Sequence, residues 1–141
     1  MKVLIATDGS EFSRAAIGKA CEMLRPKEGL LIKIVSVYEQ IVPMAAEPFA
    51  VSAQYYQEMM ELARKQCLSY VEEAASSLKT SFGGFNVHIE TEVKLGAPVN
   101  VIIDEAKDWD ADLIVVGSHG RGFWGRLTLG SVSDAIIHHA T

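Results

Sequence analysis

Apolar residues along the chain follow two patterns. The first, short runs that are either continuous or alternate with polar residues, predicts strands. Residues 2–8 and 112–117 are short apolar runs without alternation, which is typical of strands buried on both faces of a parallel sheet. A further strand is expected over residues 29–38. Residues 85–94 alternate strictly between apolar and polar side chains, so they predict a half-exposed strand near a sheet edge. The two uninterrupted runs are expected to be central neighbours in the sheet.

The second pattern places apolar residues three and four positions apart and predicts amphipathic helices. This spacing follows each predicted strand in turn, over residues 10–24, 52–78 and 96–109 and from residue 131 onwards. The chain therefore alternates strand and helix four times.

Polar residues mark the starts of two of these helices. Ser10 is placed to cap the first helix. The core-facing side of that helix is expected to comprise Phe12, Ala16, Ala20 and Met23. Ser131 and Asp134 have the spacing of a capping box, so the last helix is expected to begin at Ser131. Pro43 and Pro48 interrupt the segment before the second helix and predict a loop there.

This order of elements predicts the α/β class, with a single doubly wound domain built around a central parallel sheet. Parallel strands need crossover connections of the length that the helical segments provide. Ligands of such folds bind beyond the carboxyl ends of the central strands, at the topological switch point. Asp8 and Gly117 end the two central strands, so they are expected to face each other across a ligand site.

The composition fits one globular domain and restricts the possible functions. The chain has 141 residues, of which 49% are hydrophobic and 22% charged, enough to bury a sizeable core. The net charge of −5 and the lack of any Lys and Arg cluster argue against nucleic-acid binding. No apolar run has the length of a signal peptide or a membrane span. Cys21 and Cys67 lack metal-ligand spacing and are expected to be reduced core thiols of a cytoplasmic protein.

Residues 117–131 contain five glycines, and two nucleotide-binding patterns can be found in them. Gly120, Gly122 and Gly125 spell the G-x-G-x-x-G of dinucleotide-binding folds. That motif requires its first glycine at the strand end and an acidic residue about 20 residues further on, and the remaining chain is too short for it. A P-loop is excluded because no G-x-x-x-x-G-K-[ST] occurs in the sequence.

The other pattern consists of Gly117, Gly120 and Gly130 followed by Ser131. Each glycine has a physical use: a sharp turn after the strand, a close approach of backbone to a ligand, and the residue before a helix start. Free N–H groups and the helix dipole at residues 130–133 can bind phosphate, and the hydroxyls of Ser131 and Ser133 add donors. This pattern favours a phosphate site that needs no basic surface.

The segment "GSHGRGFWGRLTLGSVSDAIIHHA" resembles the G-x2-G-x9-G-S signature of the universal stress protein family, in its ATP-binding branch. The likeness extends over nearly the whole chain as one domain, residues 1–141, and includes "VLIATDGSEFSRAAI" and "LGAPVNVIIDEAKDWDADLIVVGSHG". It implies a Rossmann-like fold of the adenine nucleotide alpha hydrolase-like type. Family members usually continue into a short fifth strand, whereas this sequence ends at Thr141, so that edge strand is expected to be absent.

The resemblance also implies a ligand and a site. The expected ligand is ATP, with Mg²⁺ or Mn²⁺, and AMP or a cyclic nucleotide is the alternative. In the family, adenine meets main chain near the position of Val37, and the acid that matches Asp8 lies by the ribose and phosphates. The full set of implied binding residues is Ala6, Thr7, Asp8, Val37, Gly117, Gly120, Gly130, Ser131, Val132 and Ser133. A homodimer or higher homo-oligomer is implied too, although the strand that often pairs across the family's dimers is missing here.

Several residues also have plainer interpretations. Asp8 is equally of a type that caps a turn before glycine. His119 beside Ser118 suggests nucleophilic catalysis, but "GSHG" is not G-x-S-x-G and adjacent residues rarely form such a pair. His138 and His139 diverge by about 100° on a helix and cannot easily share a metal. Phe123 and Trp124 are either a partner-binding patch or residues that pack over the loop.

Two function classes remain. The first is a nucleotide-binding regulatory protein in the stress response, which holds ATP without efficient turnover. The second is an ATP-using enzyme: a slow ATPase, or a phosphoryl or adenylyl transferase. The family's ATP-consuming relatives carry an S-G-G-x-D-S loop or an H-I-G-H helix start, and this sequence has neither. We therefore expect binding rather than catalysis, and no catalytic residue is predicted.

Overall fold

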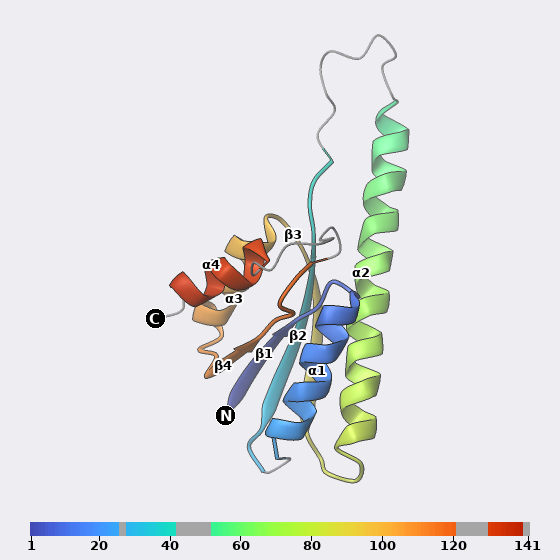
Figure 1. Cartoon of the computed structure of the whole chain (residues 1–141). Coiled ribbons are helices and arrows are strands. Elements are labelled where there is room, and N and C mark those ends of the chain that lie inside the picture. The colour runs from blue at the N-terminus through green and yellow to red at the C-terminus, as the bar shows by residue number, and fades with distance from the viewer. Residues whose placement is uncertain (26–27, 42–51, 121–129, 140–141) are drawn as a thin grey trace.

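The computed structural model describes residues 1–25, 28–41, 52–120 and 130–139 (Figure 1). Strands and helices alternate as predicted. The predicted loop with Pro43 and Pro48, Phe123 and Trp124 all lie outside the described residues. The elements are β1 (Lys2–Ala6), α1 (Glu11–Met23), β2 (Leu31–Tyr38), α2 (Ala53–Ser81), β3 (His88–Leu95), α3 (Pro98–Asp108), β4 (Leu113–Val115) and α4 (Ser131–His139).

The four described strands form one parallel sheet in the order β3-β2-β1-β4. The predicted edge position of β3 and the pairing of β1 with β4 are confirmed. The predicted central position of β4 is wrong for the described sheet, in which β4 is the other edge strand. Its side chains are apolar because both faces are covered: Leu113 and Val115 pack against one core and Ile114 against the other. Apolar sequence therefore indicates covered faces here, not a central position.

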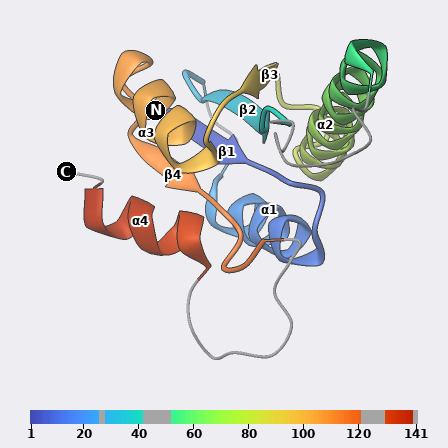
Figure 2. The same cartoon turned by 90° about the horizontal axis from the view of Figure 1, so that it is seen from above.

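Helices cover both faces of the sheet, as the doubly wound class requires. Helices α1 and α2 lie together on one side and α3 lies on the other (Figure 2). Ile102 of α3 and Ile136 of α4 pack with Leu4 and Val35 in the second core. Helix α2 extends past the sheet in Figure 1. Within the described part of the chain, no helix is long and apolar enough to span a membrane.

The face that α1 buries differs from the predicted one. The buried residues of the helix are Ser13, Ile17 and Ala20, while Met23 is 72% exposed. The sequence pattern is misleading because a serine occupies the innermost position of the first turn. Ser13 is tolerated in the core because its hydroxyl is hydrogen-bonded to Asp8.

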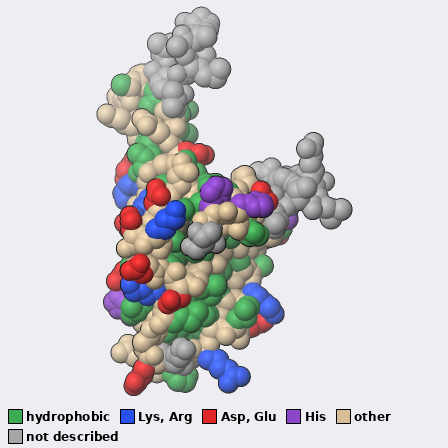
Figure 3. Space-filling view, turned by 90° about the vertical axis from the view of Figure 1, so that its left-hand side faces the viewer, with side chains coloured by type: hydrophobic (Ala, Val, Ile, Leu, Met, Phe, Trp, Pro, Cys, Tyr) green, Lys and Arg blue, Asp and Glu red, His purple; other side chains and the backbone are tan. Residues whose placement is uncertain are grey.

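Charged groups on one face of the molecule are mixed in sign. On the face shown in Figure 3, basic side chains are interspersed with acidic ones. One charged cluster is buried against the sheet: Glu105 of α3 lies between Lys33 and Lys94. Cys67 is buried and Cys21 half-buried, and both thiols are free.

Candidate functional site

A pocket of about 240 Å³ opens at the carboxyl ends of β1 and β4. All ten residues predicted to bind the nucleotide line it. The structure thus brings together residues that lie up to 127 positions apart in the sequence, from Ala6 to Ser133. Six further lining residues were not predicted: Ser13, Val35, Pro98, Ile102, Val116 and His119.

The pocket has an apolar part and a polar part. Val37, Pro98 and Ile102 come from β2 and α3 and provide an apolar wall. Asp8 and the main chain around Gly117 and Gly130 provide the polar part. Such a division suits a ligand that joins a flat apolar ring system to a hydrophilic group.

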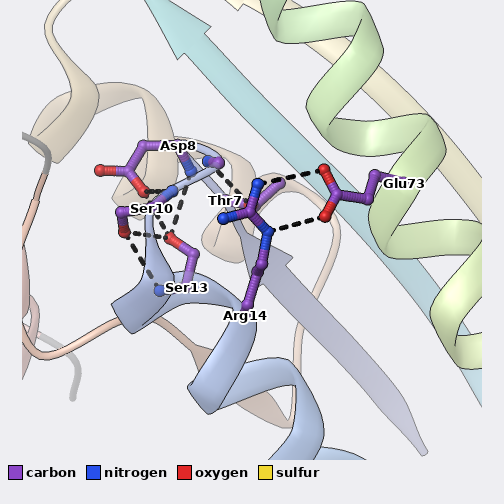
Figure 4. Close-up of polar contacts among 7 residues, drawn as sticks. Thr7, Asp8, Ser10, Ser13, Arg14 and Glu73 are labelled. Carbon is purple, nitrogen blue, oxygen red and sulfur yellow. Dashed lines mark hydrogen bonds and ion pairs between the residues drawn. The ribbon is translucent and has the colours of Figure 1, made fainter.

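Asp8 is held by the loop between β1 and α1 (Figure 4). Its Oδ1 atom accepts hydrogen bonds from the Ser13 hydroxyl at 2.5 Å and from the Ser10 N–H at 3.0 Å. Ser10 is the N-cap of α1, as predicted, and its hydroxyl accepts the Ser13 N–H at 3.2 Å. Asp8 therefore does serve the turn, and it lines the pocket at the same time.

The environment of Asp8 favours the ionised carboxylate. Burial acts to raise the pKa of Asp8, but hydrogen bonds from Ser10 and Ser13 outweigh it and hold the pKa below its ordinary value. Asp8 is the only charged side chain among the residues that line the described pocket. A negatively charged ligand consequently meets a fixed negative charge in this part of the site.

Two glycines of the signature permit close contacts between backbone segments. A Cβ atom at Gly117 would lie 2.9 Å from the Ser13 nitrogen, so this glycine lets the end of β4 pack on the first turn of α1. A Cβ atom at Gly130 would lie 3.0 Å from the His119 Cα and 3.1 Å from the Ser118 oxygen. The Gly130 N–H donates to that same Ser118 oxygen at 2.7 Å. The glycines thus fix the loop after β4 between α1 and α4.

The start of α4 differs in detail from the predicted capping box. The helix does begin at Ser131, but the Gly130 carbonyl accepts the Asp134 N–H at 2.9 Å, which puts Gly130 at the cap position. The Ser133 hydroxyl lies 2.9 Å from the Gly130 oxygen and 3.0 Å from the Ser118 oxygen. Its proton is directed to these carbonyls, so Ser133 ties the helix to the loop.

Ser118 and His119 interact although they are adjacent in the sequence. The Ser118 Oγ lies 3.0 Å from the His119 Nδ1, a contact that sequence reasoning considered rare. The His119 ring also packs against Phe12, with ring centroids 5.0 Å apart. Ser118 itself is not among the residues that line the pocket, so this pair gives no nucleophile directed at a pocket ligand. The described residues contain no His, Cys, Asp and Glu cluster that could hold a metal by itself.

Fold and site together define a doubly wound α/β protein with a ligand pocket at the carboxyl ends of its strands. Comparison with known proteins identifies the group within this class. The profile of the universal stress protein family matches residues 1–141, and the chain belongs to that family. A universal stress protein of Synechocystis is 30% identical, with 98% of this chain and 91% of the relative covered. Universal stress protein A homolog 2 of Coxiella burnetii is 33% identical, with 98% and 86% covered.

Solved structures of the family confirm the fold. The universal stress protein UspA of Lactobacillus plantarum superposes with a TM-score of 0.73 at 20% identity, over 99% of this chain and 91% of that one. A family protein of Arabidopsis thaliana with AMP bound gives 0.67 at 22% identity, over 99% and 86%. A universal stress protein in complex with cAMP gives 0.66 at 26% identity, over 99% and 89%.

Proposed function

We propose that this protein binds ATP, with Mg²⁺, and acts as a nucleotide-dependent regulatory protein in the stress response. The observation that carries the proposal is the meeting of the ten predicted residues in one pocket with an apolar and a polar part. Adenine nucleotides are bound by two structural relatives, one with AMP and one with cAMP. ATP is the form that the resemblance of the glycine signature to the family's ATP-binding branch implies, and the N-terminus of α4 favours a phosphate group beside it.

In the proposed arrangement the two parts of the pocket receive different parts of the nucleotide. Adenine lies against the apolar wall near Val37, and the phosphates lie along Gly117, Gly120 and the first turn of α4. N–H groups at that helix start and its dipole favour negative charge without requiring a lysine or arginine. A Mg²⁺ ion would offset repulsion between the phosphates and Asp8, since carboxylate and phosphate oxygens are its preferred ligands.

ATP binding without efficient hydrolysis is the first expected result. Backbone N–H groups and the Ser131 hydroxyl can hold phosphate but do not activate water, and efficient hydrolysis requires a positioned base or water-orienting group as well. Calorimetry with ATP, AMP and cAMP measures binding, and a single-turnover assay with excess protein and Mg²⁺ measures hydrolysis. Saturable ATP binding with unreacted ATP after minutes is expected. Conversion within seconds would establish the alternative, an ATP-using enzyme.

Asp8 supplies the second expected result. Replacing the carboxylate, as in Asp8→Ala or Asp8→Asn, is expected to reduce the gain in ATP affinity that Mg²⁺ provides by about tenfold, or about 1.4 kcal/mol. Calorimetric titrations with and without Mg²⁺ measure that gain, and 2′-deoxy-ATP tests whether Asp8 recognises the ribose instead. If a folded variant shows neither change, Asp8 serves only the turn.

The predicted homo-oligomer and cytoplasmic location stay predictions.

A further inference from the structure

Ser13 is the least expected polar residue of the candidate site. It is only 3% exposed and lies on the core-facing side of α1 with Ile17 and Ala20. Burying a hydroxyl costs free energy unless it is hydrogen-bonded, so the hydrogen-bond partners of Ser13 indicate its role. Those partners are Asp8, at two different atoms, and Ser10.

Counting protons fixes the direction of every bond in this cluster. The Ser13 hydroxyl has a single proton, and at 2.5 Å from Oδ1 that proton is donated to Asp8. The same oxygen accepts the Asp8 N–H at 3.3 Å. The contact between the Ser10 and Ser13 hydroxyls, at 3.2 Å, must then be donated by Ser10. With Ser13 as the donor to Asp8, Oδ1 accepts both from this hydroxyl and from the Ser10 N–H.

The cluster therefore orients the carboxylate as well as keeping it charged. Oδ1 is turned towards the start of α1 by Ser10 and Ser13. Oδ2 is turned towards the glycine loop, where a Cβ atom at Gly120 would lie 3.4 Å from it. Ser13 also contacts that loop from the other side, because its nitrogen lies 2.9 Å from the Cβ position of Gly117.

We propose that Ser13 is a positioning residue of this pocket, which fixes the orientation of the Asp8 side chain through the hydrogen bond to Oδ1. The part of this proposal that concerns the ligand rests on the proposed nucleotide function. A carboxylate fixed in this way selects ligands that offer a divalent cation or hydroxyl groups at that point, as the Mg²⁺ complex of a nucleotide or its ribose does. Ser13 acts through Asp8 and need not touch the ligand.

Other groups near Asp8 must be considered when its titration is measured. Among the described residues, these groups include Arg14 on α1, His119 after β4, and Tyr70 and Glu73 on α2. Arg14 is engaged with Glu73 through an Nε–Oε1 contact of 2.7 Å, which exchanging the Ser13 side chain leaves in place. The Arg14–Glu73 pair is therefore the same in the original protein and in the Ser13 variants.

The test is an NMR titration of the Asp8 carboxyl carbon in the full chain, with Asp8→Asn to assign the signal. Ser13→Ala is expected to raise the Asp8 midpoint by about one pH unit, because one charge-assisted hydrogen bond is lost while the burial remains. An unchanged midpoint overturns the proposal. Ser13→Thr and Ser13→Val form a matched pair of equal shape, in which only threonine keeps the hydroxyl. The threonine variant should titrate at the lower pH, and equal midpoints would contradict the proposal even where Ser13→Ala does not fold.

ATP binding to the same variants provides the second readout. The factor by which Mg²⁺ increases ATP affinity is expected to be about tenfold smaller in Ser13→Ala than in the original protein. In Ser13→Thr this factor is expected to return. Loss of that gain in both variants alike would show that the hydroxyl does not set ligand selection. If the unaltered protein binds no ATP, the proposed function fails, while the Asp8 titration still decides whether Ser13 positions the carboxylate.

Discussion

Gly130→Val is expected to weaken ATP binding by about 100-fold, equivalent to about 2.8 kcal/mol. Atoms around the Cβ position of Gly130 belong to the backbone: the His119 Cα at 3.0 Å, the Ser118 oxygen at 3.1 Å and the Gly120 nitrogen at 3.5 Å. Backbone atoms cannot rotate out of the way as side chains do. The valine must therefore displace residues 118–120 from α4 by at least a few tenths of an ångström and lengthen the 2.7 Å hydrogen bond from its own N–H to Ser118. Calorimetry with Mg²⁺ and ATP measures the loss.

Gly18 provides the control, because it is not among the residues that line the pocket. Gly18 lies on α1 with nothing within 4 Å of its Cβ position, and Gly18→Ala is expected to stabilise the helix by about 1 kcal/mol without affecting ATP. Unimpaired ATP binding by a folded Gly130→Val protein would refute the proposed phosphate site.

The sequence predicts that Gly130 is important for ATP binding, but it does not show why a valine at this position would weaken binding. Spacing alone identified Gly130 as the residue before a helix, and suggested that a side chain there would fill the approach to phosphate. The structure adds that α4 packs directly on the backbone of residues 118–120. Contacts between two backbone segments leave no periodic signal in a sequence, because no side chain reports them.

Side-chain periodicity predicted the elements well and their orientation less well. The four described strands and four described helices were located, since covered strands give continuous or alternating apolar runs and buried helix faces give a spacing of three to four. The predicted core face of α1 was wrong because it was chosen from apolar residues, whereas the buried face includes Ser13. A signal was available: Asp8, Ser10 and Ser13 have the spacing of a turn followed by a capped helix, in which side chains bond to one another.

Glu105→Ala is expected to lower the free energy of unfolding by about 3–5 kcal/mol, the usual cost of breaking a buried ion pair from one side. The Glu105 side chain is 7% exposed, and its Oε1 atom lies 2.7 Å from the Nζ of Lys33, whose side chain is 14% exposed. Its other oxygen bonds to Lys94. Removing the carboxylate leaves the Lys33 ammonium largely shielded from water without this counter-charge, and among the described residues the Trp109 ring, 5.0 Å away, still interacts with it. Urea unfolding at pH 7 measures the difference.

The pH dependence of the same variant separates loss of charge from loss of packing. Burial acts to raise the pKa of Glu105, but hydrogen bonds from Lys33 and Lys94 hold it below the ordinary value. A carboxyl with a lowered folded-state pKa stabilises the protein above its unfolded pKa of about 4.3, and this contribution is lost as the pH falls through the folded value. The difference in free energy of unfolding between the original protein and Glu105→Ala should therefore become smaller below pH ~4. In the double variant Lys33→Met, Glu105→Leu, most of the stability should return, because no unpaired charge stays buried. If the difference in free energy of unfolding between the original protein and Glu105→Ala does not change with pH, Glu105 contributes through packing alone.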